Sequence, residues 1–317
     1  MRSSGTLLCL ASGAAFGAMA IFGKLAYDDG ATVGTLLAVR FLIAAALFWV
    51  IVVASGAARE RRALSRRDAA VGLALGGCGY AIQAGCFFAA LERIDASLLS
   101  LLLYTYPAIV AAAAILLGRE RLQPRRLTAL VIASAGLVLV LASAGTGELD
   151  AVGVALALAS AVVYSTYILV SEKIASRLRP TLLAALVCSG AAVSLTIGSA
   201  LLGDLRPGEL TAAGWGWLLC LALVSTVAAI SLFFAGLRRV GPTTASILST
   251  VEPVVTVLLA FLVFGETLEG LQLVGGACVI AAVLVLHARR PRPAWKARAE
   301  PATPVAAPDP QCTASRS

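Results

Sequence analysis

Long apolar segments, separated by short polar or basic ones, fill the chain up to about residue 287. Each segment approaches the ~20 residues with which an α-helix crosses the hydrocarbon core of a bilayer. A helix satisfies its own backbone polar groups there, so the pattern predicts an all-α polytopic membrane protein. We expect ten transmembrane helices over residues 6–25, 32–54, 69–91, 97–117, 125–143, 151–170, 181–202, 214–236, 243–264 and 270–287.

The second half of the chain repeats features of the first. The pattern Phe-Phe-Ala-x-Leu-x-Arg begins at Phe87 and again 146 positions later at Phe233. A proline and then a glutamate follow at that same offset, namely Pro107 and Glu120 in the first half and Pro253 and Glu266 in the second. Leu-Ala-Ser occurs at residues 10–12 and 158–160, which places the first span opposite the sixth. These matches predict an internal duplication.

The duplication predicts two inverted five-helix repeats, because five spans are an odd number and turn the second copy upside down. Inverted repeats are common in secondary transporters, whose binding sites lie near mid-membrane between the halves. We expect the first repeat over residues 1–146 and the second over 147–288. A basic, proline-rich tail over 289–317 is expected to be disordered in the cytoplasm.

The positions of the basic residues predict the orientation. The two ends and every second loop between them together hold 21 of the 25 lysines and arginines. Cytoplasmic segments carry the excess of Lys and Arg, so both termini are expected to be cytoplasmic. The net charge of +8 therefore reports topology, and we expect no nucleic acid as a partner.

Composition agrees with a membrane protein and leaves little material for catalysis. The chain is 60% hydrophobic and 13% charged, with a mean hydropathy of +0.93. Six of the seven cysteines lie in apolar segments without metal-ligand spacing, and there is one histidine. Most acid–base enzyme mechanisms need more catalytic histidines, cysteines or similar groups than these. We expect no enzyme activity, no cofactor and no metal site.

Glu252 is the acid that lies well inside an expected span, and Pro253 follows it. An ionised carboxylate there costs on the order of 2.5 kcal/mol or more, so it should face a cavity or a partner. Pro253 has no N–H and removes the helical hydrogen bond to the carbonyl of Ser249. Two interpretations stay open: Glu252 binds substrate or a proton, or its carboxylate stabilises the proline break.

Arg40 is the second charge at depth, ~12 Å into the second span at 1.5 Å per residue. Two interpretations are again open, because Arg40 either faces a cavity or forms an ion pair with Glu252. Glu120 and Glu266, at the ends of spans, are expected to have structural roles at helix ends.

Polar and aromatic residues at helical spacing complete the candidate site. They suit a cavity for small organic solutes, but interhelical hydrogen bonds use the same residue types. Helix breaks are expected at Pro107 and Pro253. The candidates for substrate binding or for lining the cavity are Glu252, Arg40, Tyr80, Gln83, Tyr104, Tyr106, Tyr164, Tyr167 and Ser249.

The chain resembles the EamA-type transporters of the drug/metabolite transporter superfamily. The resemblance rests on the ten spans, on Glu252-Pro253-Val254, and on Leu-Gly-Arg-Glu-Arg-Leu (117–122) and Phe-Gly-Glu-Thr-Leu (264–268) after the mid-helix prolines. It implies a secondary transporter of the cell inner (plasma) membrane that moves small metabolites such as amino acids, usually by export and by alternating access. The alternative is a membrane-embedded enzyme or signalling protein on a transporter-like scaffold. The expected partners are a small-molecule substrate and the lipid bilayer, with protons as candidate coupling ion and a homodimer as candidate assembly.

Overall fold

The computed structural model describes residues 2–55, 64–117, 124–143, 150–175, 177–240, 248–249 and 251–287, and within these residues it is helical. The first half contains α1 (Arg2–Gly17), α2 (Met19–Asp28), α3 (Val33–Ala54), α5 (Arg66–Ala74), the π-helical η1 (Leu75–Tyr80), α6 (Ala81–Leu91), α7 (Ala96–Leu103), α8 (Tyr106–Leu116) and α9 (Pro124–Ser143). The second half contains α10 (Ala151–Ala175), α11 (Pro180–Leu201), the 3₁₀ turn η3 (Pro207–Glu209), α12 (Ala212–Ala222), the π-helical η4 (Leu223–Ala228), α13 (Ala229–Val240), α15 (Val251–Phe264) and α16 (Gly270–His287).

The helices include six that are long and apolar enough to cross a membrane. Four shorter apolar helices accompany them: Ala96–Val110, Leu127–Leu139, Val251–Phe264 and Gly270–Ala282. Each of the ten expected spans thus has a helical counterpart, which confirms the predicted all-α fold class. The start of the ninth span, residues 243–247, lies outside the described residues, as do Glu120 and the predicted tail over 289–317.

Several helices begin where a polar side chain accepts a hydrogen bond from a backbone N–H of the first turn. Thr32 caps α3 through Thr35 N at 3.1 Å, and Thr211 caps α12 through Gly214 N at 3.0 Å. Asp150 caps α10 by accepting from the N–H groups of Val152 and Gly153. The backbone N–H of Gly153 and the guanidinium of Arg93 lower the pKa of Asp150. These caps set the helix starts at the ends of apolar runs.

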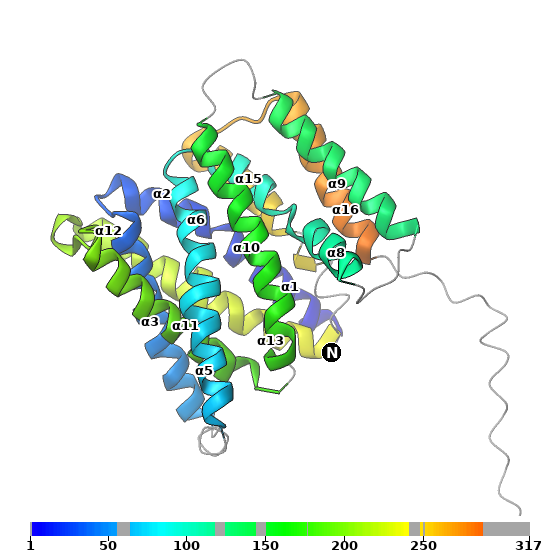
Figure 1. The fold of residues 1–317 in the computed structure, drawn as a ribbon. Coiled ribbons are helices and arrows are strands. Elements are labelled where there is room, and N and C mark those ends of the chain that lie inside the picture. Colours follow the sequence, from blue (N-terminus) through cyan, green and yellow to red (C-terminus); the bar gives the residue numbers. More distant parts are fainter. Residues whose placement is uncertain are drawn as a thin grey trace, which may run out of the picture. The chain divides into compact units, whose positions relative to one another are not determined.

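Equivalent contacts in the two halves show the duplication directly. Ser12 Oγ donates to the carbonyl of Ala229 at 2.7 Å, and Ser160 Oγ donates to the carbonyl of Gln83 at 3.2 Å. The two serines correspond in the aligned repeats, and so do the two carbonyls. α1 packs on α13 as α10 packs on α6, while α3 packs on its counterpart α11. α9 and its counterpart α16 lie side by side (Figure 1). Each repeat therefore contacts the other through equivalent residues.

The two repeats also share a backbone irregularity. The π-helical turns η1 and η4 begin 148 residues apart, at Leu75 and Leu223. A π-helical turn inserts one residue into an α-helix and often marks a functional site. Near η1 the helices approach closely, since a Cβ on Gly76 would lie 2.0 Å from the carbonyl oxygen of Val187. Glycine is therefore required where η1 contacts α11.

The two mid-span prolines lie in the first turns of new helices. α7 ends at Leu103, and α8 begins at Tyr106 with Pro107 as its second residue. Pro253 is the third residue of α15. A first-turn position suits proline because the N–H groups there have no intrahelical acceptor. In the first repeat the helix break thus lies just before the proline, at Tyr104 and Thr105.

Candidate functional site

A cavity of about 90 Å³ lies between residues of both repeats. Phe16, Met19, Phe87 and Phe88 are among its apolar lining residues. By volume it has room for several water molecules or a small polar solute. The polar side chains that line it are Arg40, Tyr80, Gln83, Tyr104, Tyr106, Tyr164 and Glu252. The structure therefore brings together seven of the nine residues that the sequence suggested for a cavity.

Arg40 is 2% exposed and is held by groups that carry no charge. Its Nε donates to Thr226 Oγ1 at 2.9 Å, and its Nη2 donates to the sulfur of Met19 at 3.1 Å. The guanidinium also lies 5.0 and 5.3 Å from the ring centroids of Phe41 and Phe88. Arginine carries five N–H donors, so donors remain for a ligand in the cavity.

Thr226 positions Arg40 and was not predicted as a site residue. It lies in the π-helical turn η4, where its hydroxyl donates to the carbonyl of Leu221, five residues back. With its own proton used in this way, Oγ1 is an acceptor for the N–H of Arg40. No local sequence pattern signals this role, because a π-helical turn in an apolar run has no distinct composition.

Glu252, the second residue of α15, reaches the same cavity from the second repeat. Its Oε2 lies 3.0 Å from the hydroxyl of Tyr104. The hydroxyl of Thr256 lies 2.9 Å from the carbonyl oxygen of Gly17 and 3.1 Å from that of Glu252. A Cβ on Gly17 would lie 2.7 Å from the carbonyl oxygen of Glu252. Close packing of α1 thus fixes the start of α15.

Arg40 and Glu252 line one cavity but do not form an ion pair with each other. Among the ion pairs between described residues, none joins the two. Of the two interpretations of Arg40, the geometry matches the cavity-facing one. A guanidinium and a carboxyl group therefore face the same small cavity without pairing with each other.

Aromatic rings connect the two ends of the site. Tyr106 contacts Tyr104 at 5.8 Å and Tyr164 at 4.8 Å between ring centroids. Tyr167 is absent from the lining of the cavity, but it stacks on Tyr164 at 6.3 Å and contacts Tyr80 at 5.6 Å. Tyr167 thus supports the rings of the cavity from behind.

Gln83 and Ser249 enter the site differently from the other candidates. The amide of Gln83 donates to Ser160 Oγ at 3.1 Å, so it has the interhelical hydrogen bond that the sequence left as an alternative. Ser249 contributes its carbonyl oxygen, which accepts from the hydroxyl of Tyr104 at 2.8 Å. This carbonyl lies four residues before Pro253, which has no N–H to donate to it.

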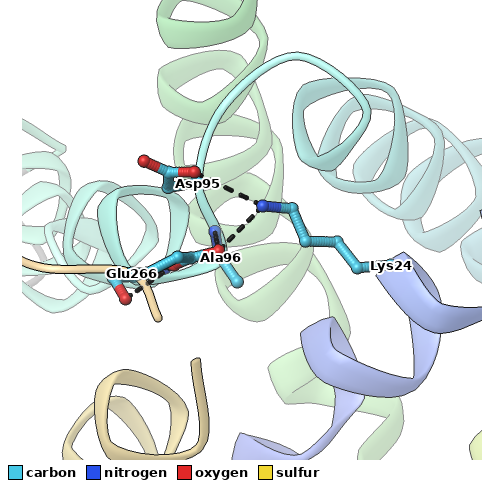
Figure 2. Close-up of polar contacts among 5 residues, drawn as sticks. Lys24, Asp95, Ala96 and Glu266 are labelled. Carbon is cyan, nitrogen blue, oxygen red and sulfur yellow. Dashed lines mark hydrogen bonds and ion pairs between the residues drawn. The ribbon is translucent and has the colours of Figure 1, made fainter. Parts of the chain in front are cut away.

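Glu266 organises a second polar cluster, outside the expected spans, in the connection from α15 to α16 (Figure 2). Its side chain is 7% exposed and accepts from Lys24 Nζ at 2.7 Å. It also accepts from the backbone N–H groups of Ala96 and Ser97 at the start of α7, and from the Ser97 hydroxyl. Burial by itself would raise the pKa of Glu266, but the hydrogen bonds from Lys24 and Ser97 bring it below its ordinary value. The predicted structural role at a helix end is confirmed for Glu266.

Comparison with known proteins identifies the family. The model of the EamA-like transporter family matches residues 3–142 and, a second time, residues 151–287. The chain belongs to this family. It is accordingly a multi-pass membrane transporter with two EamA repeats, and the alternative of a membrane enzyme is excluded by the family.

Relatives of this EamA protein are also transporters by name. An uncharacterized transporter from Archaeoglobus fulgidus is 30% identical over 63% of this chain and 70% of its own length. The uncharacterized transporter YcbK of Bacillus subtilis is 26% identical over 91% of this chain and 94% of its own. The threonine/homoserine exporter RhtA of Salmonella typhimurium is 28% identical over 67% of each chain. A solved crystal structure at 21% identity superposes with a TM-score of 0.63 over 90% of this chain and 97% of its own, which shows the shared fold.

Proposed function

We propose that this EamA transporter moves small zwitterionic, amino-acid-like solutes through the cavity by alternating access, in the direction of export. The observation that carries the proposal is that a guanidinium, Arg40, and an ionisable carboxyl group, Glu252, face one cavity without an ion pair between them. An uncompensated buried charge costs several kcal/mol. A zwitterionic solute supplies a carboxylate that matches the planar fork of the guanidinium, and an ammonium group that pairs with Glu252 in its ionised form.

Two further findings support this substrate class. The cavity is small, and aromatic rings surround it, which suits a compact solute with an apolar side chain. The relative RhtA is named as an exporter of threonine and homoserine, both of which are zwitterions. The direction of export for this chain rests on that relative and on the family resemblance.

Solute exchange in proteoliposomes tests the proposal. Vesicles that contain the purified full-length protein and unlabelled threonine are placed in labelled threonine, in the matching α-hydroxy acid, or in threonine amide. We expect the zwitterion to exchange and each analogue, which lacks one charge, to exchange at least about tenfold more slowly, since one charge-assisted hydrogen bond is lost. Equal rates for all three solutes, or exchange of none in a panel of amino acids, would contradict the proposal.

We further propose that both termini are cytoplasmic, from the distribution of basic residues. Single cysteines at Glu209 and Arg177, whose side chains are 57% and 66% exposed, test this in a cysteine-free background. An impermeant thiol reagent applied to intact cells is expected to label position 209 and to label position 177 only after permeabilisation. Transport by the cysteine-free protein is the control. The opposite pattern, with position 177 labelled in intact cells and position 209 only after permeabilisation, would contradict the proposal.

A further inference from the structure

The hydroxyl of Tyr104 lies between two acceptors. Its oxygen is 2.8 Å from the carbonyl oxygen of Ser249 and 3.0 Å from Oε2 of Glu252. A tyrosine hydroxyl has one proton to donate. Tyr104 can therefore donate to the carbonyl or to the carboxylate, but not to both.

The protonation state of Glu252 decides which acceptor is used. An ionised carboxylate only accepts, so it takes the proton of Tyr104, and two oxygens then face each other at Ser249 without a proton between them. A protonated carboxyl donates to the Tyr104 oxygen instead, and Tyr104 donates to the Ser249 carbonyl. Both short contacts are hydrogen bonds only in the second arrangement. The observed geometry therefore fits a protonated Glu252, whereas the ionised form is the one that would pair with the ammonium group of the proposed solute.

This chain of hydrogen bonds joins the proline breaks of the two repeats. Tyr104 directly follows the last residue of α7 and precedes Pro107 in the first repeat. Ser249 carries the carbonyl that the proline of the second repeat, Pro253, cannot serve. One hydroxyl thus spans from the helix break of one repeat to that of the other.

We propose that Tyr104 is the positioning residue through which protonation of Glu252 controls the contact between the two proline breaks, and that the proton is the coupling ion. The proposal rests on the transport function proposed above. A hydronium ion in the cavity gives its proton to Oε2 of Glu252 and becomes water. Tyr104 keeps its own proton and turns it from Glu252 to the carbonyl of Ser249. Loss of the Glu252 proton reverses both changes and weakens the link between the repeats.

The other groups around Glu252 do not provide an alternative to its hydrogen bond with Tyr104. α1 and α2 present Phe16 and Met19, which carry no charge. The remaining titratable or charged groups that face the cavity are Arg40 from α3, Tyr80 from η1, Tyr106 from α8 and Tyr164 from α10. Among the described residues, Tyr104 is the one whose side chain hydrogen-bonds the Glu252 carboxyl group.

Tyr104→Phe tests the link, with Tyr106→Phe as the matched control. Tyr106 lines the same cavity and contacts the Tyr104 ring, but within the described part of the chain its hydroxyl forms no hydrogen bond. In proteoliposomes, Tyr104→Phe is expected to lower the ratio of pH-gradient-driven flux to solute exchange at equal pH by about tenfold or more, the effect of losing one hydrogen bond to a charged group. In Tyr106→Phe, this ratio is expected to stay that of the parent protein.

Infrared spectroscopy of the purified protein gives a readout that needs no substrate. The stretching band of the protonated Glu252 carboxyl is identified as the band that titrates in the parent protein and is missing in Glu252→Gln. In Tyr104→Phe the carboxyl group loses its acceptor, so we expect this band to move to higher frequency. In Tyr106→Phe we expect it to stay in place.

The outcomes separate this inference from the proposed function. A parent protein that exchanges no solute contradicts the proposed function, while the infrared band still reports on Glu252 and Tyr104. A parent protein that exchanges solute, together with full gradient-driven flux or an unmoved band in Tyr104→Phe, overturns the inference alone. If Tyr104→Phe is not produced, Glu252→Gln is the second test. The amide of the new glutamine donates to Tyr104 at every pH, so the hydrogen bonds can no longer change with protonation. Gradient-driven flux that persists in Glu252→Gln would overturn the inference.

Discussion

Arg40→Gln is expected to reduce solute exchange on the order of 100-fold, because a carboxylate in the cavity would lose two charge-assisted hydrogen bonds of about 1.5 kcal/mol each. Arg40→Lys keeps the charge but not the planar fork, so we expect an intermediate rate. Exchange of labelled threonine in proteoliposomes measures both. Arg206→Gln removes an exposed arginine and is the matched control, with an unchanged rate expected.

The stability of Arg40→Gln distinguishes a binding role from a structural one. Replacement loses the hydrogen bond to Thr226 and the ring contacts, each worth about 1 kcal/mol. It also removes a buried charge whose desolvation costs several kcal/mol. These effects offset each other, so abundance and melting temperature in detergent should stay near those of the parent. A wild-type exchange rate would remove Arg40 from the substrate site, and a large loss of abundance would assign it a structural role.

Glu266→Gln is expected to destabilise the protein by about 2–3 kcal/mol, because it leaves Lys24 without its closest partner and weakens the cap of α7. Glu266 ties three segments together: α2, the start of α7 and the connection after α15 (Figure 2). The melting temperature in detergent measures the effect. Asp95→Asn is the matched control, since Asp95 is 66% exposed and lies 3.4 Å from the same Lys24. A surface pair of this kind contributes about 0.5 kcal/mol.

The pH dependence of stability gives a second test of Glu266. Although burial opposes ionisation, hydrogen bonds from Lys24 and Ser97 lower the pKa of Glu266 in the folded protein. Its contribution is then present above the unfolded pKa and is lost as the pH falls through the folded pKa. The parent protein should therefore lose more melting temperature on acidification than Glu266→Gln does. Parallel curves for the two proteins would show that Glu266 does not contribute through its charge.

The helical framework could be predicted because a bilayer leaves an apolar segment few alternatives. Each expected span has a helical counterpart, from Ser4–Asp28 near the N-terminus to Gly270–Ala282. Proline chemistry is equally local, so Pro107 and Pro253 could be placed at helix starts or breaks before any tertiary contact was known. The duplication also follows from the sequence, and the hydrogen bonds of Ser12 and Ser160 show it in three dimensions.

The partners of the candidate residues could not be predicted. The sequence allowed an ion pair between Arg40 and Glu252, whereas the structure places Thr226 and Met19 against Arg40. Gln83 and Tyr167 looked like equals of the other candidates, but one is tied to Ser160 and the other lies behind the rings that line the cavity. Such differences depend on small rotations of each helix about its own axis, smaller than the angle between successive residues. The spacing of residues along the sequence does not resolve rotations of that size.

The sequence by itself thus determined the membrane class, the helical spans, the two repeats and the types of residue that are costly in a bilayer. Those features follow from local hydrophobicity and backbone chemistry, which act over one helix at a time. The tertiary structure alone decided that Arg40 and Glu252 share a cavity without pairing, and that Tyr104 reaches from one proline break to the other. These contacts join residues far apart in the chain, and they depend on how closely the helices pack. One example is Gly17, whose lack of a side chain lets the start of α15 lie against α1.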